Sequence, residues 1–435
     1  METNRRNFLQ ATGAAFTTSL FTGKVRGAND KIAVGFIGMG KMGRSNLKYA
    51  LQQENVVVPA VCDVYDRNLN WAVDIAKGQA LKGGARGVRD FRDVLADKSI
   101  DAVCIATPDH WHPYMTVEAC KAGKDVYVEK PICTVADEAP KMVEAARKYN
   151  RVVQAGTMQR SAVHFQHAVE AVRGGKIGKV TFVRTWNYSN DKQEGIGNPP
   201  DQPPPAGLDW DMWLGPAPQR EFNPNRFGVD PKDKYFSRFR WFWDYAGGMM
   251  TDWGVHWLDI VQMAFQEEMP RNITALGGKF WLTDDRETPD TLQVTYEYPS
   301  GFLAVYENRD GNAQSMFQKG GGILFHGTEG TLFVDRSEFH IVPERGSDLE
   351  PSQEKSTSSG NALHWQNFLE CIRTRQRPIS DIEKCAHSTT TCLLGNVALR
   401  SQLRLDWDVQ QWTVEQAPAK KFLTREYRSP WNLTV

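Results

Sequence analysis

The first third of the chain alternates short apolar runs with stretches of helical spacing. Five apolar runs have the length of a strand and no polar face: residues 32–37, 56–61, 100–107, 125–129 and 152–155. Runs of this kind are typical of strands that are buried on both sides. Four stretches have helical spacing: residues 44–53, 91–97, 112–122 and 135–149. This order predicts a doubly wound α/β domain with a parallel sheet over residues 29–155.

The pattern changes after residue 156. A strand-like run at 180–186 is followed by residues 195–231, which are rich in Pro, Gly, Asp and Trp and have no periodicity. Four alternating runs then predict a mostly antiparallel sheet: residues 291–298, 302–308, 323–326 and 331–334. Four helices are expected here: residues 162–172, 249–265, 362–373 and 382–404. We therefore expect a second α/β domain over residues 156–435.

A glycine-rich turn joins the first apolar run to the first helix. Its residues are Gly38, Met39, Gly40, Lys41, Met42 and Gly43. In such a turn the first glycine permits the tight bend, the second lets the backbone approach a pyrophosphate, and the third lets helix and strand pack closely. The free N–H groups of the helix N-terminus favour phosphate. The turn predicts a dinucleotide site; the alternative is a structural β-α-β turn with no ligand.

The second apolar run ends at Asp63, twenty residues after Gly43. A carboxylate at this position can accept hydrogen bonds from a ribose 2′-hydroxyl and would repel a 2′-phosphate. We therefore expect NAD in preference to NADP, although Arg67 lies close enough in sequence to suit the phosphate of NADP.

Two further strand ends carry polar side chains. Thr107, Pro108 and His112 follow one strand, and Glu129 and Lys130 end the next. Ligands of an open parallel sheet bind outside the carboxyl ends of its strands. We therefore expect these five residues to contact the nicotinamide half of the cofactor. The alternative interpretation of Lys130 is a solvated loop lysine.

Asp252 and His256 are spaced by four residues in the predicted helix over 249–265 and would share one face. Such a pair on its own is more often a surface ion pair than a catalytic one. Beside Lys130, however, it suits proton transfer. His256 titrates near neutrality and can take the proton of a secondary hydroxyl, Asp252 can orient the imidazole, and Lys130 can donate to the same oxygen.

The composition argues against several classes of binding partner. Lys plus Arg number 52 and Asp plus Glu number 52, so no net charge attracts nucleic acid or anionic lipid. No apolar run reaches the ~18 residues of a membrane span. The seven cysteines include no pair or Cys/His spacing typical of a metal site, and we expect neither a metal nor a disulfide.

The N-terminus has the features of a processing segment. Arg5 and Arg6 precede Phe8 and Leu9, and a modestly apolar stretch follows. This order resembles a twin-arginine export signal, which carries folded proteins across a membrane. We expect residues 1–28 to be the signal and the protein to be periplasmic or exported. The alternative is a basic, disordered start.

Taken together, the motifs resemble the Gfo/Idh/MocA family of nicotinamide-dependent oxidoreductases. The resemblance is carried by the glycine turn, by Ala106-Thr107-Pro108 with His112, by Glu129-Lys130-Pro131, and by Asp252 with His256. It implies a Rossmann domain followed by an α/β domain with a large open-faced sheet, and a homo-oligomer, either a dimer or a tetramer. It also implies that Lys130, Asp252 and His256 surround the carbon that exchanges hydride, and that NAD is bound before export and retained.

The expected function is oxidation or reduction at a secondary hydroxyl of a small carbohydrate. Eight of the fourteen tryptophans fall between Trp186 and Trp281, and aromatic rings suit the C–H faces of sugars. We expect Trp111, Arg160 and Trp186 to contact the sugar. One alternative is a glycoside-cleaving enzyme that oxidises a ring hydroxyl, eliminates the aglycone, adds water and reduces the ketone again. Another is a non-catalytic exported sugar-binding protein.

Overall fold

A seven-stranded parallel sheet holds the glycine turn. The computed structural model describes residues 31–77, 84–228 and 237–435, so the predicted export signal with Arg5 and Arg6 lies outside the described residues. The sheet contains β1 (Ile32–Ile37), β2 (Val56–Val57), β3 (Ala60–Cys62), β4 (Arg86–Val88), β5 (Ala102–Ile105), β6 (Asp125–Val128) and β7 (Val153–Ala155). Its order is β4-β3-β1-β5-β6-β7, with β2 beside β1, and the order reverses between β1 and β5. The predicted doubly wound sheet is confirmed.

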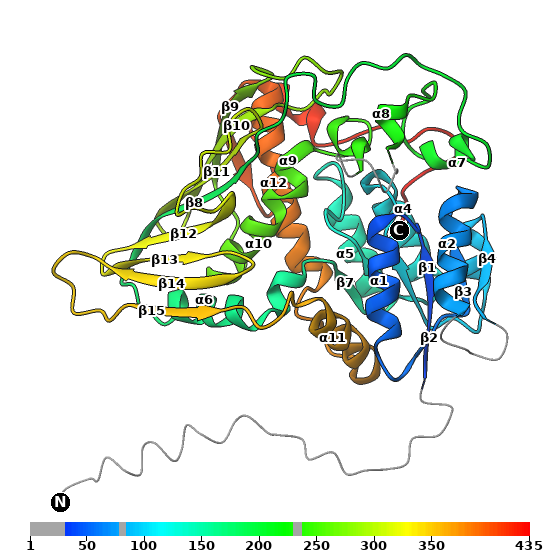
Figure 1. Cartoon of the computed structure of the whole chain (residues 1–435), viewed down its shortest axis with the longest axis horizontal. Helices are drawn as coiled ribbons and strands as arrows, with labels where there is room; N and C mark the ends of the chain where they lie inside the picture. The colour runs from blue at the N-terminus through cyan, green and yellow to red at the C-terminus, as the bar shows by residue number, and fades with distance from the viewer. Residues whose placement is uncertain (1–30, 78–83, 229–236) are drawn as a thin grey trace, which may run out of the picture. The chain divides into compact units, whose positions relative to one another are not determined.

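Five helices cover the two faces of this sheet (Figure 1). They are α1 (Lys41–Leu51), α2 (Asp66–Lys77), α3 (Phe91–Ala96), α4 (His112–Lys121) and α5 (Glu138–Lys148). The sequence pattern did not predict α2 and β4, because α2 buries mainly small side chains and β4 is an edge strand with two exposed residues. The apolar run 56–61 is two strands and not one, since Val58 and Pro59 interrupt it and proline donates no ladder hydrogen bond.

The second sheet has ten strands in the order β15-β14-β13-β12-β8-β11-β10-β9-β16-β17. Its strands are β8 (Val180–Tyr188), β9 (Asn272–Gly278), β10 (Thr291–Tyr298), β11 (Phe302–Arg309), β12 (Gly321–Gly327), β13 (Gly330–Val334), β14 (Glu338–Pro343), β15 (Ser352–Lys355), β16 (Leu405–Asp408) and β17 (Thr413–Val414). Only β8 and β11 pair in parallel; the other neighbours are antiparallel. The prediction of a mostly antiparallel sheet is confirmed.

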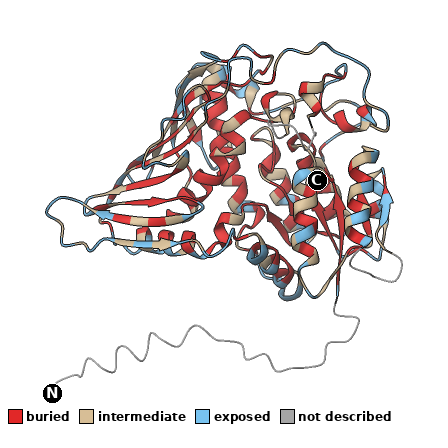
Figure 2. Cartoon of the chain, in the orientation of Figure 1, coloured by how far each residue is buried: buried red, intermediate tan, exposed pale blue. Residues whose placement is uncertain are grey.

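Helices pack on one face of this second sheet and bury its apolar side chains (Figures 1 and 2). They are α6 (Val163–Arg173), α10 (Gly254–Ala264) and α12 (Ile382–Ser401). The opposite face carries exposed apolar side chains: Leu276 on β9 is 83% exposed, Val342 on β14 48% and Leu303 on β11 42%. The sheet is therefore open on that face within the described chain.

The predicted single helix over 249–265 is wrong. The chain forms α9 (Gly248–Asp252) and then α10, with Trp253 between them. Close packing accompanies the break, because a Cβ on Gly254 would lie 2.7 Å from the Met250 side chain and 3.3 Å from the Tyr306 ring. Asp252 and His256 consequently stand on two consecutive helices.

Helix α11 (Asn361–Thr374) belongs to the second half of the sequence but packs on the parallel sheet. Trp365 is fully buried, stacks on Tyr127 of β6 with ring centroids 4.7 Å apart, and donates from Nε1 to Asn46 Oδ1 of α1 at 3.0 Å. Residues from both predicted domains thus share one apolar core.

The proline- and tryptophan-rich stretch after β8 folds around an aromatic core of its own. It contains α7 (Trp210–Leu214) and α8 (Pro224–Phe227), and its buried side chains include Trp210, Trp213, Phe227 and Trp241. Arg286, buried between Asp284 and Asp310, lies 4.3 Å from the Trp241 ring centroid and ties this stretch to the second sheet. The cluster of tryptophans in this region is thus explained mainly by packing, and it is weaker support for a carbohydrate site than the sequence suggested.

Candidate active site

The glycine turn has the geometry that a dinucleotide requires. Gly38 has φ of +85°, and a Cβ there would lie 2.6 Å from the Thr107 backbone nitrogen. A Cβ on Gly43 would overlap the Gly38 carbonyl oxygen, so the third glycine lets α1 approach the turn. A Cβ on Gly40 would meet no protein atom within 4 Å, and Gly40 lines a cavity. Since Gly40 also caps α1 without a side-chain hydrogen bond, this space fits a pyrophosphate against the helix N-terminus.

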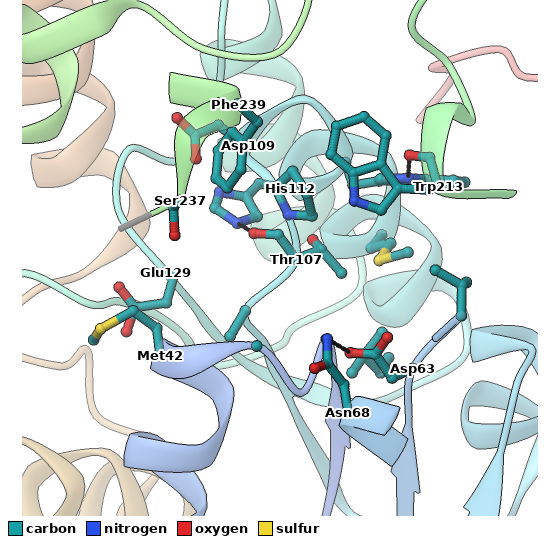
Figure 3. Close-up of a pocket in the computed structure, with 18 of the residues that line it drawn as sticks. Met42, Asp63, Asn68, Thr107, Asp109, His112, Glu129, Trp213, Ser237 and Phe239 are labelled. Atoms are coloured by element: carbon teal, nitrogen blue, oxygen red, sulfur yellow. Dashed lines mark hydrogen bonds between the residues drawn. The ribbon is translucent and has the colours of Figure 1, made fainter. Parts of the chain in front are cut away.

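Asp63 lies at the carboxyl end of β3, beside the glycine turn (Figure 3). Its carboxylate accepts hydrogen bonds from the backbone N–H of Met39 at 2.6 Å and of Tyr65 at 2.8 Å. Burial raises the pKa of Asp63 to about 6, and these hydrogen bonds oppose the rise. Arg67 stacks on Tyr65, 4.8 Å from the ring centroid.

One cavity extends from the glycine turn past Asp63 to the ends of β5 and β6 (Figure 3). The predicted cofactor residues Lys41, Met42, Thr107, Pro108 and His112 all line it. Met39, by contrast, is fully buried in the core of the parallel sheet and meets the site only through its backbone N–H on Asp63. Trp213, Phe227 and Phe239 close the far side of the cavity.

His112 connects the segments that follow β5 and β6 through hydrogen-bond contacts of its two ring nitrogens. One ring nitrogen, Nδ1, lies 2.7 Å from the Pro131 carbonyl oxygen, and Nε2 lies 2.9 Å from that of Thr107. Burial lowers the pKa of His112 to about 4. Next to it, Glu129 accepts a hydrogen bond from Asn46 Nδ2 at 2.7 Å, and burial raises the pKa of its carboxyl. Both residues hold the backbone that presents Lys130.

Lys130 and Asp252 both line the cavity and form a partly buried ion pair. Lys130 Nζ lies 2.8 Å from Asp252 Oδ1 and 3.1 Å from the Asp252 carbonyl oxygen. Arg240 Nη1 lies 2.6 Å from the second carboxylate oxygen, Oδ2. Burial disfavours the carboxylate, but the charges of Arg240 and Lys130 outweigh it and lower the pKa of Asp252 to about 2. The sequence did not predict Arg240, because only the folded chain brings it to Asp252.

His256 is not among the residues that line the cavity, although the charge of Lys130 reaches it. It is 5% exposed, and its Nδ1 has no hydrogen-bond partner among the described residues. Burial, followed by the charges of Arg336 and Lys130, lowers the pKa of His256 well below its ordinary value, so the imidazole is neutral. The expectation that Asp252 orients His256 is wrong, because both carboxylate oxygens of Asp252 bind Lys130 and Arg240.

Asp109 is a further acidic side chain in the cavity, and it was not among the predicted site residues (Figure 3). It is 8% exposed, and its carboxyl makes no hydrogen bond or ion pair with another side chain of the described chain. Burial, with a contribution from Asp252, raises the pKa of Asp109 to about 8, against the opposing charges of Lys130 and Arg240. Asp109 is therefore mostly protonated at neutral pH and can donate a hydrogen bond.

Two of the three expected sugar contacts are wrong. Arg160 is 1% exposed and paired with Asp259 at 2.7 Å and with Glu267. Trp186 is fully buried, and its Nε1 donates to the Lys319 carbonyl oxygen. Trp111 lies in the cavity wall but is 2% exposed, and its Nε1 donates to the Trp213 carbonyl oxygen.

No group of three His, Cys, Asp or Glu side chains in the described chain is arranged to hold a metal ion. The seven cysteines are free thiols and all are buried. None of the described helices is both long enough and apolar enough to cross a membrane.

Two family models match the chain. One, an oxidoreductase family with an NAD-binding Rossmann fold, matches residues 32–157. The other, an oxidoreductase family C-terminal alpha/beta domain, matches residues 176–433. The parallel sheet and the glycine turn therefore belong to an NAD-binding Rossmann domain.

Curated relatives match over part of their length. Inositol 2-dehydrogenase of Rubrobacter xylanophilus is 35% identical over 176 residues, which cover 40% of this chain and 48% of the relative. A glycosyl hydrolase family 109 protein of Shewanella baltica is 33% identical over 171 residues, which cover 33% of this chain and 37% of the relative. The chain thus spans less than half the length of these two relatives.

Solved structures share the fold over nearly all of their length. The WlbA dehydrogenase of Bordetella pertussis, in complex with NADH and UDP-GlcNAcA, has a TM-score of 0.65 at 19% identity, with 87% of this chain and 99% of that chain covered. The aldose-aldose oxidoreductase of Caulobacter crescentus has a TM-score of 0.64 at 18% identity, with 86% and 99% covered. At these identities the likeness establishes the fold alone.

Proposed function

This chain belongs to the Gfo/Idh/MocA family of oxidoreductases, and we propose that it uses NAD to oxidise or reduce a secondary hydroxyl of a sugar or sugar derivative. The observation that carries the proposal is that the Lys130–Asp252 ion pair lines the same cavity as the glycine turn and Asp63. The inositol 2-dehydrogenase among its relatives supports this substrate class.

Bound NAD would supply the hydride acceptor or donor. The chain's own residues transfer the hydroxyl proton and stabilise the charge that develops on the reacting oxygen. Lys130 donates a hydrogen bond to the reacting oxygen and stabilises its developing negative charge. Asp252 and its own carbonyl hold the Lys130 ammonium in place. His256, neutral and with a free Nδ1, accepts the hydroxyl proton. Proton transfer of this kind contributes about 10²–10⁴ in rate.

We infer that the cofactor is NAD and that it is retained. The Asp63 carboxylate beside the glycine turn would repel a 2′-phosphate, which favours NAD over NADP. The aromatic side chains of Trp213, Phe227 and Phe239 line the same cavity and add apolar contact area for the cofactor, which favours slow release. Denaturing the purified protein and analysing the released nucleotide tests both points. NADP, or less than about one nucleotide per ten chains, would contradict them.

Single-turnover reduction of bound NAD⁺ by candidate sugars, followed by absorbance, tests the proposed reaction. Reduction of the bound nucleotide by at least one hexose, hexose derivative or inositol is the expected result. Sugar binding without any reduction would instead support a non-catalytic binding protein.

A second candidate is glycoside cleavage by transient oxidation of the sugar ring. The protonated carboxyl of Asp109, in the same cavity as Lys130, favours it, because an acid is needed to protonate a departing aglycone. The glycosyl hydrolase family 109 relative is consistent with it. Release of nitrophenol from a nitrophenyl glycoside without net change in NAD would identify this reaction. Net formation of NADH with a ketose product would exclude it.

We also propose that residues 1–28 direct export to the periplasm and that the protein is a dimer or tetramer. Arg5 and Arg6 motivate the first proposal, and the exposed Leu276, Leu303 and Val342 on the open sheet face motivate the second. Replacing both arginines by lysine should keep the protein in the cytosol. Light scattering should give two or four times the chain mass of 49.1 kDa, and a monomer would contradict the oligomer.

A further inference from the structure

Arg336 lies next to the proposed catalytic residues but on a separate element. It follows β13 in the turn to β14. Its Nε donates to Gln159 Oε1 at 3.1 Å, and Gln159 Nε2 donates to the His256 carbonyl oxygen at 3.1 Å. The Arg336 guanidinium also stacks on Trp253, 4.4 Å from the ring centroid. One hydrogen bond and one aromatic face therefore fix its position beside His256.

The guanidinium of Arg336 lacks a carboxylate partner among the described residues. The nearby Asp252 divides its oxygens between Lys130 and Arg240. The acids on either side of Arg336 in the turn are also engaged elsewhere, since Lys319 pairs with Asp335 at 3.5 Å and with Glu338 at 2.8 Å. The charge of Arg336 nevertheless reaches the site, because it contributes to the lowered pKa values of His256 and Asp252.

The local charge is positive on balance. Lys130, Arg240 and Arg336 are cations, and Asp252 is an ionised carboxylate shared by the first two. His256 is neutral, and the carboxyl of Asp109 is mostly protonated at neutral pH. Arg336 is exposed and does not itself line the cavity, and its terminal nitrogens are thus a positively charged donor pair next to His256.

We propose that Arg336 binds a carboxylate of the substrate, so that the substrate class is an acidic sugar such as a hexuronate. This inference rests on the proposed sugar oxidoreductase function and narrows it. A planar guanidinium presents two parallel N–H donors that match a carboxylate. A phosphate carries more charge and more acceptors and generally recruits several cations or backbone N–H groups. Because Lys130 and Arg240 are both paired with Asp252, the one guanidinium of Arg336 favours the carboxylate. A charge-assisted pair of this kind changes affinity by about 10–100-fold.

Calorimetry on the full-length protein with its retained nucleotide tests the inference. The probes are D-glucuronate against D-glucose, D-galacturonate against D-galactose, and glucose 6-phosphate as a different anion. At least one hexuronate should bind ten or more times more tightly than its parent hexose. Arg336→Gln should abolish that preference while affinity for the hexose changes less than twofold. Arg336→Lys, which keeps the charge but loses the paired donors, should keep part of it.

Arg345→Gln is the matched control, because Arg345 is an exposed arginine in the loop that follows β14. It should bind every probe like the wild type. Equal affinity for hexose and hexuronate, binding of neither, or a preference that survives Arg336→Gln would overturn the inference. Tighter, Arg336-dependent binding of glucose 6-phosphate would replace the carboxylate by a phosphate and overturn it as well.

Absorbance of the bound nucleotide, recorded on the same samples, reports separately on the proposed function. A hexuronate that binds through Arg336 without reducing NAD⁺ would leave this inference standing and remove the proposed oxidation. If a neutral hexose reduces NAD⁺ as well in Arg336→Gln as in the wild type, and no hexuronate is preferred, the proposed oxidation stands and this inference is removed.

Discussion

Asp252 is the residue whose role differs most from the sequence-based expectation. Its two oxygens are shared by Lys130 and Arg240, and these cations lower its pKa to about 2 in spite of burial. A carboxylate committed to two cations is not an orienting partner for an imidazole. In the proposed reaction Asp252 therefore acts through Lys130, whose ammonium it binds, and His256 accepts the hydroxyl proton of the substrate without a carboxylate partner.

Substitutions at these residues should separate direct from indirect roles. Lys130→Met and His256→Ala are each expected to reduce the single-turnover rate by about 10²–10⁴. Asp252→Asn should also slow the reaction. Combining Asp252→Asn with Lys130→Met should give nearly the rate of Lys130→Met alone, because Asp252 acts through Lys130. Reduction of bound NAD⁺ followed by absorbance gives these rates.

Lys141→Met is the control, since Lys141 on α5 forms a partly exposed ion pair with Asp137, the residue that precedes this helix. It should retain the wild-type rate. Bound nucleotide should stay at the wild-type level in all variants, as none of the altered side chains contacts the glycine turn. Fully multiplicative losses in the double variant would show that Asp252 acts independently of Lys130.

Asp109 should make the stability of the nucleotide-free protein depend on pH. Its pKa is about 8 in the folded protein and ~3.9 in an unfolded chain, so the folded state holds a proton that the unfolded state releases between these values. The free energy of unfolding should therefore fall as pH rises from about 4 to 8, by up to about 1.4 kcal/mol per pH unit. Asp109→Asn should flatten this decline, as measured by melting temperatures at a series of pH values.

The exposed Asp74 on α2 provides the comparison, and Asp74→Asn should leave the pH profile unchanged. Other buried acids, such as Asp310, also contribute to the wild-type decline. The informative quantity is thus the difference between Asp109→Asn and the wild type. Parallel profiles for those two proteins would mean that Asp109 is ionised in the folded state.

At the scale of the element, two glycines of the turn have different roles: Gly40 leaves space for the ligand, and Gly43 allows close packing within the fold. Gly40→Ala should leave the melting temperature of the nucleotide-free protein unchanged and reduce nucleotide retention, because its Cβ would enter only the cavity. Gly43→Ala should lower both, since its Cβ would overlap the Gly38 carbonyl. Thermal unfolding and nucleotide content per chain measure the two effects.

Gly320→Ala serves as the control, because its Cβ would have ordinary contact with the Tyr188 carbonyl oxygen at 3.5 Å, outside the cavity. It should change neither quantity appreciably. A Gly40→Ala variant with full nucleotide content would place the pyrophosphate elsewhere.

The sequence predicted those parts of the site that consist of residues close together in the chain. The glycine turn, Asp63 and the strand ends at Thr107 and Lys130 were predicted, because the carboxyl ends of parallel strands share one edge of the sheet. The separation of α9 from α10 was not, since it accompanies close packing of Gly254 against Tyr306 of a distant strand. Arg240 and Arg336 were missed for the same reason: each reaches the site through tertiary packing.

At the scale of the whole molecule, α11 makes the Rossmann domain dependent on the rest of the chain. Trp365 fills the core between α11 and the parallel sheet and also bonds Asn46. Trp365→Ala should cost about 3–5 kcal/mol of unfolding free energy and loosen nucleotide binding as well. Trp365→Phe, which keeps the stacked ring but loses the hydrogen bond, should cost about 1 kcal/mol. Denaturant unfolding monitored at both sheets gives these values, and a loss confined to α11 would contradict the shared core.

The contact between Tyr127 and Trp365 can form only late in the synthesis of the chain. Tyr127 leaves the ribosome 238 residues before its stacking partner Trp365. At roughly 5–20 residues per second, that interval is about 12–48 seconds. Until then the part of the sheet that α11 covers stays exposed, although the last strand of the sheet, β7, is complete at residue 155. A nascent chain of this length is therefore a natural client for chaperones that shield apolar surface until the last quarter of the protein arrives.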